Sequence, residues 1–334
     1  MTPGISIIGQ TRTGETVHRV VLSDGALSAS VLTLGVALQD VRLADVAHSL
    51  TVGSPSLAAY EDAMQTCGTI VGPVGNRIGN AHAVINGKAC DFDANLNGRH
   101  TLHGGLAATH RKIWELADHQ RDHALFHLTL PAGEGGFPGT RRLSARFDIA
   151  GPTLRLTLGA ETDAPTLMNL ANHSYWRLAD QPDYSGLGVQ IAADHYLPIT
   201  APDYLPTGEK RAVDNTRFDM RKTRRLDPAT DGLWDNNFCL SQSRQPLRRV
   251  ATLTGPTGLA MDMATTEPGL QVFDGHNLGR PDCPGNDGRA YVAHAGLALE
   301  AQFWPDAPNN PDFPDITLHP GDDWQQVTTW TFRR

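Results

Sequence analysis

The chain has 334 residues, and its 28 Lys and Arg against 36 Asp and Glu give a formal net charge of −8. This acidic balance argues against a nucleic-acid backbone as the main partner, and no apolar run approaches the ~20 residues needed to span a bilayer. With 40% hydrophobic and only 19% charged residues, the chain can build a large core and is not expected to be disordered.

Period-two alternation of apolar residues dominates the chain. The stretches 17–22 and 27–34 flank Ser23-Asp24-Gly25, and Asn86-Gly87 follows Val84-Ile85. Both sites predict β-hairpins, because glycine accepts the positive φ that such turns require. Further alternating runs begin at Phe126, Leu143, Leu154, Leu259 and Trp330. Each run can bury one face and expose the other, as strands do when a sheet packs on a second sheet.

Helical signals are few. Ser54-Pro55 predicts a short helix carrying Leu57, Tyr60 and Met64, because proline is tolerated in the first turn. The 33 Gly and 22 Pro fit many turns between short strands, and the polar segment 198–225 is interpreted as a long loop. We therefore predict an all-β fold, with residues 1–334 forming a single large β-sandwich domain.

The cysteines and the N-terminal residues favour a cytoplasmic protein. No two of the four cysteines, at positions 67, 90, 239 and 283, have the C-x-x-C spacing of a zinc or redox motif. Reduced thiols are therefore expected rather than a disulfide framework. The segment 1–6 also lacks the basic start and long apolar stretch of a signal peptide.

Two polar clusters lie in glycine-rich segments of the first third of the chain. In 75–80, Asn76 and Arg77 are bracketed by glycines, which offers several hydrogen-bond donors on a backbone that can approach a ligand closely. In 102–105, His103 precedes two glycines. Taken alone, each cluster is more typical of an ordinary turn than of a ligand site. The nearby His100 and His110 have the spacing of neither a helical pair nor a Cys/His finger, so no metal is expected.

A third cluster, 169–176, contains two amides, an imidazole, a hydroxyl and two aromatic rings. Burying such groups without partners costs ~1–3 kcal/mol each, so they either satisfy one another or face a polar ligand. His173 is the natural proton donor, since its unperturbed pKa is about 6.5; a structural core histidine is the alternative. A nucleophilic Ser174 beside it is not favoured, because adjacent strand residues point to opposite faces.

The fourth cluster, 296–306, contains a carboxylate in an apolar run. Alternation would bury Glu300, and a buried carboxylate is often catalytic because it is costly unless paired. The alternative is a glutamate at a strand end that faces solvent. Period two places Gln302 and Trp304 on the same face, and an amide and an indole beside a carboxylate suit a sugar.

Two further polar segments, 235–238 and 267–271, complete a pattern over nearly the whole chain. In order and content, these clusters resemble the aldose 1-epimerases of the galactose mutarotase family. The matching stretches are Asn76-Arg77-Ile78, Leu102-His103-Gly104-Gly105, Asn172-His173-Ser174-Tyr175, Asp235 with Asn237-Phe238-Cys239, Pro268-Gly269 with Gln271, Leu299-Glu300, Trp304-Pro305-Asp306-Ala307 and the C-terminal Asn310-Pro311, Phe313-Pro314, Leu318 and Pro320-Gly321. The Asn-His-Ser-Tyr and Glu-x-Gln-x-Trp-Pro-Asp stretches are the most specific.

The resemblance implies a large twisted antiparallel β-sandwich, the galactose mutarotase-like supersandwich, with few short helices and an open sugar cleft. It implies an isomerase that uses neither a cofactor nor a metal. The residue matching His173 is the general acid in this family, and the one matching Glu300 is the general base. The residues implied to hold the sugar are Arg77, His103 and Asp235, with Asn76 and Gln271 at positions that add hydrogen bonds.

Some positions depart from the family pattern and leave the preferred sugar open. Asn236 stands where a histidine is common, and 274–277 replaces the commoner Tyr-Thr-Gly-Asn type of stretch with Asp274-Gly275-His276-Asn277. Trp176-Arg177 stands where Phe-Asn is more usual.

Three functions are therefore considered. The leading hypothesis is a mutarotase that interconverts the α and β anomers of a free aldose by acid/base ring opening. A hexose-6-phosphate 1-epimerase, recruiting Arg77 and the segment 221–225 for phosphate, is the second, and a non-catalytic sugar-binding domain is the third. The expected partner is a monosaccharide rather than a nucleic acid or membrane, and the expected state is a monomer or homodimer.

Overall fold

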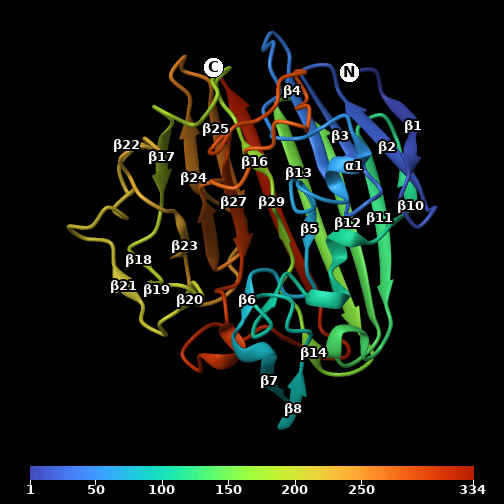
Figure 1. Ribbon diagram of the computed structural model, residues 1–334, viewed down its shortest axis with the longest axis vertical. Helices are drawn as coiled ribbons and strands as arrows, with labels where there is room; N and C mark the ends of the chain where they lie inside the picture. The colour runs from blue at the N-terminus through green and yellow to red at the C-terminus, as the bar shows by residue number, and fades with distance from the viewer.

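The computed structural model describes residues 1–334 and consists mostly of antiparallel strands arranged in layers (Figure 1). The prediction of a large antiparallel β-sandwich with few short helices is confirmed. The largest sheet has nine strands, in the order β10 (Glu115–His119), β11 (His123–Leu130), β12 (Arg141–Ala150), β13 (Thr153–Thr162), β29 (Trp324–Arg333), β25 (Ala260–Thr265), β24 (Arg248–Thr254), β17 (Gly188–Ile191) and β22 (Arg224–Arg225).

A six-stranded sheet forms the second layer. Its order is β16 (Tyr175–Trp176), β27 (Leu297–Gln302), β26 (Gly269–Phe273), β23 (Asp235–Cys239), β18 (His195–Tyr196) and β21 (Arg211–Ala212). An N-terminal sheet contains β1 (Gly4–Gln10), β2 (Thr16–Ser23), β3 (Leu27–Leu32) and β4 (Leu38–Leu43). Both chain ends lie at the same end of the molecule (Figure 1).

Short elements connect these sheets. Five two-stranded pairs are β14 (Thr166–Leu167) with β28 (Thr317–Leu318), β15 (Ala171–Asn172) with β5 (Ile70–Val71), β19 (Ile199–Thr200) with β20 (Leu205–Pro206), β6 (Arg77–Ile78) with β9 (Thr101–Leu102), and β7 (His82–Ile85) with β8 (Lys88–Asp91). The helices are α1 (Leu57–Tyr60) and the 3₁₀ turns η1 (Gly79–Ala81), η2 (Gly105–Ala107), η3 (Thr109–Arg111), η4 (Glu134–Gly136) and η5 (Ala307–Asn309). No helix is long and apolar enough to cross a membrane.

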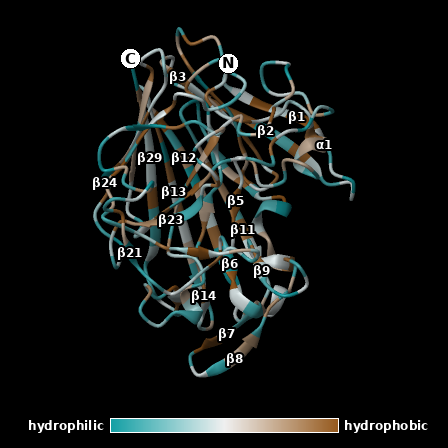
Figure 2. Ribbon diagram, turned by 60° about the vertical axis from the view of Figure 1, so that its left-hand side comes forward, coloured by the Kyte–Doolittle hydropathy of each residue, from teal (hydrophilic) through white to brown (hydrophobic).

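The alternation in the sequence accounts for the long strands. In β12 every second side chain is buried, and β13 follows the same pattern, so one face of each strand lies in the core. Figure 2 shows hydrophobic and hydrophilic residues following one another along the strands. Both predicted hairpins are present, as β2–β3 and β7–β8. In the second, Asn86 and Gly87 have φ values of 48° and 75°, as a type I′ turn requires.

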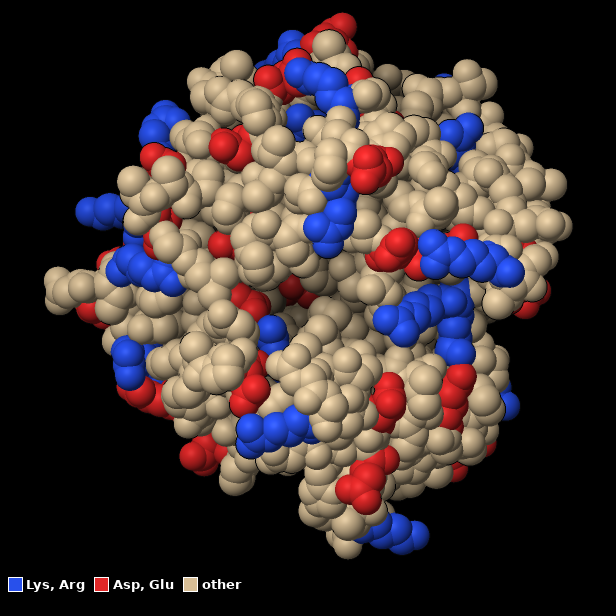
Figure 3. Space-filling model, in the orientation of Figure 1, with Lys and Arg blue, Asp and Glu red and all other residues tan.

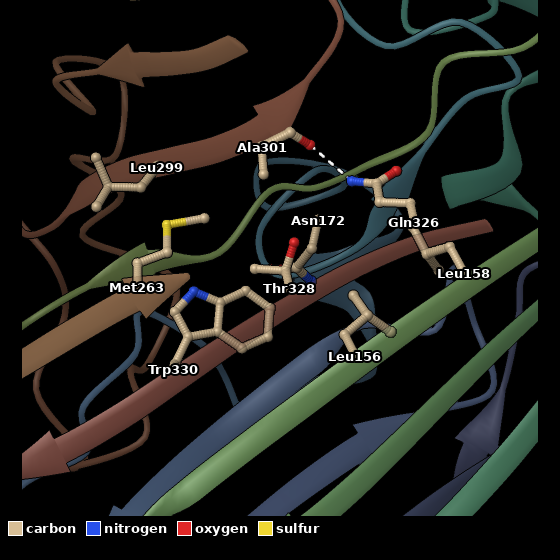
Figure 4. Close-up of a pocket in the computed structure, with 9 residues that line it drawn as sticks. All are labelled: Leu156, Leu158, Asn172, Met263, Leu299, Ala301, Gln326, Thr328 and Trp330. Atoms are coloured by element: carbon tan, nitrogen blue, oxygen red, sulfur yellow. Dashed lines mark hydrogen bonds between the residues drawn. The ribbon is translucent and has the colours of Figure 1, made fainter. Parts of the chain in front are cut away.

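The core between the two large sheets fixes the orientation of β27. Leu299 and Ala301 point toward Trp330 and Met263 of the nine-stranded sheet (Figure 4). Gln326 Nε2 reaches across and donates to the Ala301 carbonyl at 2.9 Å. Because alternate strand residues face opposite ways, Glu300 is directed to the other side of the sheet, away from this core.

Two expectations about local structure need correction. The predicted helix is a single turn, so Met64 lies beyond its end, although it is still buried. The segment 198–225 is not a continuous loop, since it contains four two-residue strands, β19 to β22. Its short pairings lack the period-two apolar pattern that would have revealed them.

Candidate active site

A cleft of about 550 Å³ lies over the face of the six-stranded sheet that is turned away from the core. Figure 3 shows it as a hollow near the centre of the molecule, with acidic and basic side chains on its walls. Six of the seven predicted site residues line it, namely Asn76, Arg77, His103, His173, Asp235 and Glu300. The fold therefore brings side chains from distant segments into one cavity.

Strand register explains how the floor of the cleft is built. In the six-stranded sheet, Gln271 of β26 pairs with Glu300 of β27 on one side and with Asn237 of β23 on the other. Asp235, two residues before Asn237, shares that face because side chains repeat with period two. Three neighbouring strands thus present polar groups on one face while their apolar residues enter the core.

His173 and Glu300 meet at the bottom of the cleft. His173 lies between β15 and β16, where its N–H donates to the Thr69 carbonyl and its own carbonyl accepts from Gly68 N, both at 2.9 Å. This places His173 Nε2 3.6 Å from Glu300 Oε1, a contact without a hydrogen bond. His173 Nδ1 and Glu300 Oε2 have no partner within the protein, so both groups retain hydrogen-bonding capacity.

Burial shifts the pKa of both groups in opposite directions. Desolvation raises the pKa of Glu300 to about 8, with a further rise from the charge of Asp235 and a reduction from Arg77. Desolvation lowers the pKa of His173 to about 4. At a pH between these two pKa values, Glu300 is protonated and His173 is neutral, because burial disfavours the charged form of either group. One acid and one base therefore lie side by side.

A chain of hydrogen bonds runs across the cleft next to this pair. Asn76 Oδ1 accepts from Arg77 N at 2.9 Å and from Arg77 Nη1 at 3.3 Å. Arg77 Nη2 donates to Asp235 Oδ2 at 3.1 Å, and Gln271 Nε2 donates to Asp235 Oδ1 at 2.6 Å. Gln271 itself does not line the cleft. Gln271 therefore contacts Asp235 instead of the cavity, whereas the family likeness implied that it contacts the sugar directly.

His103 has a fixed ring orientation. Its Nδ1 accepts a hydrogen bond from Asn76 N at 3.1 Å, so in the neutral imidazole the proton is on Nε2. Burial, and the proximity of His173, His110 and Arg77, hold the pKa of His103 well below its ordinary value. The neutral ring can therefore donate from Nε2 at physiological pH.

Aromatic rings form the walls around the acid/base pair. The His173 ring lies 5.0 Å from that of Tyr175 and 6.4 Å from that of Phe273, and Arg77 lies 5.7 Å from the ring of Tyr204. All three aromatic residues line the cleft. Phe273 was missed, although period two from Gln271 places it on the same face. Tyr204 comes from the 198–225 segment, where no sequence signal pointed to the cleft.

Comparison with known proteins identifies the family. The aldose 1-epimerase family model matches residues 18–331. A galactose mutarotase from Mus musculus is 32% identical over 329 residues, which covers 96% of this chain and 95% of that protein. The chain belongs to the aldose 1-epimerase family. The aldose 1-epimerase of Escherichia coli is 29% identical over 91% of this chain and 89% of its own length.

Solved structures agree with this assignment. A GalM/aldose epimerase homologue from C. elegans has a TM-score of 0.86 at 26% identity, covering 95% of this chain and 98% of the other. Galactose 1-epimerase from Lactobacillus acidophilus has a TM-score of 0.83 at 23% identity, covering 99% and 98%, and thus shares the fold. Aldose 1-epimerases are isomerases, and the sugar-converting family implies a monosaccharide substrate.

Of the three departures from the aldose 1-epimerase pattern, Trp176-Arg177 is buried and does not line the cleft, and the other two lie in different places. Asn236 points away from the cleft and donates to the Leu197 carbonyl at 3.0 Å, so it makes no contact with a ligand there. His276 lines the cleft, and Asp274 lies buried beneath it. Asp274 Oδ1 accepts from His276 Nδ1 at 2.8 Å.

Two predicted contributions to the cleft are wrong. Trp304 does not line it, because β27 ends at Gln302 and the alternation stops there. Its indole packs on Phe313 in a separate core cluster and donates to the Pro268 carbonyl at 3.0 Å. Gln302 is on the same face as Glu300 but is completely buried.

The basic segment 221–225 also lies outside the cleft. Arg221 forms ion pairs with Asp194, Asp214 and Asp219 at 2.6 to 3.1 Å. Its guanidinium is therefore neutralised elsewhere on the surface, and the segment offers no phosphate site next to Arg77. Across the whole chain, no three His, Cys, Asp or Glu side chains converge as metal ligands do.

Proposed function

We propose that this protein is an aldose 1-epimerase, or mutarotase, in which His173 is the general acid on the ring oxygen and Glu300 is the general base on O1. The contact of His173 Nε2 with Glu300 Oε1 at 3.6 Å, within a cleft of sugar size, carries this proposal. The substrate is a free aldose, whose α and β anomers the enzyme interconverts.

The chemistry needs one proton to leave the sugar and another to enter it. The Glu300 carboxylate takes the O1 proton, and the O1 electrons form the C1=O1 bond as the C1–O5 bond breaks. The His173 imidazolium gives its proton to O5. After half a rotation about C1–C2, O5 attacks the other face of C1, and both proton transfers reverse. Each positioned donor or acceptor contributes ~10²–10⁴-fold.

The burial of the pair favours ring opening. The closed ring reacts with the carboxylate and imidazolium, whereas opening leaves a protonated Glu300 and a neutral His173. These are the forms that desolvation favours at neutral pH. The buried site therefore stabilises the protonation state that accompanies the open-chain aldehyde, and the two roles exchange for closure.

The remaining cleft residues would hold the sugar still while C1 turns. Arg77 and His103 supply N–H donors for ring hydroxyls, and Asp235 supplies an acceptor. Asn76 orients Arg77 and, through its backbone N–H, the His103 ring. Gln271 acts through Asp235. Retaining the hydroxyls in fixed contacts lets only the C1 end move, which suits reclosure to either anomer.

Polarimetry tests the proposal directly. Freshly dissolved α-glucose, α-galactose and L-arabinose each relax to an equilibrium optical rotation, and the enzyme should speed this relaxation for at least one of them without changing the end point. Relaxation at the buffer rate for every sugar would count against the assignment, and saturable sugar binding without acceleration would indicate a binding domain instead.

We place the enzyme in the cytoplasm. All four cysteines are free thiols in the structure, which supports a reducing compartment. Alkylation of the protein in extracts prepared under acid quench would test this, because four free thiols are expected and fewer would argue for an oxidising location.

A further inference from the structure

The hairpin loop between β19 and β20 brings Tyr204 into the cleft. Residues 201–204 form this loop, because Thr200 pairs with Leu205 across the hairpin. Tyr204 N donates to the Thr200 carbonyl at 2.7 Å and closes the loop. The Tyr204 side chain lines the cleft, and its ring centre lies 5.7 Å from the guanidinium carbon of Arg77. An aromatic ring therefore packs against the arginine to which the proposed mechanism assigns sugar binding.

The backbone of Tyr204 has a conformation that tyrosine rarely adopts. Its φ is 55°, in the left-handed region, where glycine or asparagine is the usual loop residue and a bulky side chain is an outlier. Asn76 and His103 share this backbone conformation, with φ values of 62° and 51°, and both also line the cleft. Strained backbone conformations cluster at binding and active sites. The strain at Tyr204 therefore indicates that its side chain contributes to the cleft rather than to the stability of the fold.

Asp203, the residue before Tyr204, fastens the loop to the neighbouring segment. Its Oδ2 accepts from Arg99 Nη1 at 3.1 Å and lies 3.5 Å from Nε2 of the fully buried His100. Because His100 Nδ1 accepts from Asn80 N at 2.9 Å, the neutral ring carries its proton on Nε2, on the side of Asp203. Strand pairing and these contacts together fix the loop, so the Tyr204 ring is positioned before a sugar binds.

The Arg77 guanidinium has polar partners at its edge and an aromatic partner beside it. Asn76 Oδ1 and Asp235 Oδ2 accept its N–H groups at 3.3 and 3.1 Å, whereas the Tyr204 ring makes a cation–π contact with it. All four residues line the cleft. The ring thus lies next to the hydrogen-bonding groups that the proposed mechanism gives to the sugar hydroxyls.

We propose that Tyr204 is a further sugar-binding residue, whose ring packs against a C–H face of the pyranose while Arg77 and Asp235 bind its hydroxyls. This inference rests on the proposed mutarotase function. A pyranose carries C–H groups on its faces and hydroxyls around its rim, so an aromatic ring beside fixed polar groups suits it. Such packing stabilises the bound sugar and the transition state alike, so it should affect KM and leave kcat nearly unchanged.

Polarimetric kinetics of Tyr204 variants, on the sugar that the wild type turns over fastest, test this role. Tyr204→Gly should raise KM by about 3- to 10-fold, the value of one aromatic contact, and keep kcat within about twofold of the wild type. Tyr204→Phe keeps the ring and should keep the wild-type KM. The Tm of Tyr204→Gly should stay close to that of the wild type, because glycine relieves the left-handed strain as the ring is removed.

Asn215→Gly is the matched control. Asn215 also has a positive φ, 58°, and belongs to the same 198–225 segment, but it is exposed and does not line the cleft. The control variant should therefore have the KM and kcat of the wild type.

The outcomes separate this inference from the mutarotase function. If the wild type accelerates mutarotation but Tyr204→Gly keeps its KM, or if Tyr204→Phe loses as much as Tyr204→Gly, the ring does not bind the sugar and the mutarotase function stands. A lowered kcat together with a large fall in Tm in Tyr204→Gly would show a structural role and would also refute the inference. If the wild type accelerates the mutarotation of no sugar, the mutarotase function fails and the inference with it.

Discussion

Arg77 Nη2 donates to Asp235 Oδ2 at 3.1 Å across 158 positions of sequence. The second oxygen of the same carboxylate accepts from Gln271, so Asp235 links Arg77 of β6 to β26 in the floor of the cleft. Burial raises the pKa of Asp235, although the Arg77 charge and both hydrogen bonds act in the other direction. The carboxylate is thus held by its partners against the cost of burial.

Replacing this carboxylate should affect sugar binding and stability together. Asp235→Ala leaves the Arg77 guanidinium and the Gln271 amide without partners, so we expect KM to rise at least ~10-fold and the free energy of unfolding to fall by ~1–3 kcal/mol. Asp235→Asn keeps an acceptor and should recover part of both losses. Polarimetric kinetics and urea unfolding measure the two effects, and an unchanged KM in the alanine variant would show that Asp235 does not hold the sugar.

The backbone beside His103 has no room for a side chain. Gly104 has a φ of +86°, and a Cβ there would overlap the Gly72 carbonyl oxygen. Gly104→Ala should therefore destabilise the fold by more than the ~1–2 kcal/mol of left-handed strain alone and should displace His103. Gly98→Ala is the control, because Gly98 also has a positive φ, +65°, but faces open space. Equal unfolding free energies for the two variants would contradict this.

Substitution of two neighbouring residues of β27 should affect different properties, stability at Leu299 and activity at Glu300. Leu299 faces the core and Glu300 faces the cleft, so Leu299→Ala should lower the free energy of unfolding by ~2–5 kcal/mol. The cavity left by this change lies behind the sheet, so the folded fraction should keep most of its activity. Denaturant titration with activity per folded molecule measures both. Loss of activity without loss of stability in Leu299→Ala would mean that the two faces are not separated as described.

The division of β27 into two faces also shows what the sequence could predict. Period-two alternation correctly separated core from cleft within the strands, and it located the hairpins through their turn residues. The same alternation is enough to predict that Glu300 is buried. The pattern failed at Trp304, because sequence does not show that the strand ends at Gln302.

Loop residues of the cleft were beyond such reasoning. Tyr204 and Arg280 reach the cavity only through the packing of irregular segments, which have no periodicity to follow. The sequence also could not show that Asp235 is the hydrogen-bond partner of Gln271. Its register opposite Glu300 shows which face it shares, but only three-dimensional placement shows that Asp235 lies within 2.6 Å of its amide.

The raised pKa of Glu300 predicts a dependence of stability on pH. Burial raises this pKa from 4.5 to about 8, so the folded state keeps a proton that the unfolded chain releases above about 4.5. The resulting contribution to stability is present at low pH and is lost as pH rises toward 8. The Glu300→Gln variant cannot ionise at this position, so its free energy of unfolding should increase relative to that of the wild type as the pH rises from 4.5 to about 8. A difference that does not change with pH would contradict the raised pKa.

The most direct test of the account is the rate of mutarotation in His173→Ala, Glu300→Ala and the double variant, measured by polarimetry on the sugar that the wild type turns over fastest. Each single variant should fold and lose at least ~10²-fold in rate. The double variant should lose little more than either single one, since the two groups act as a unit. Wild-type rates in either single variant would contradict the assignment of the acid/base pair.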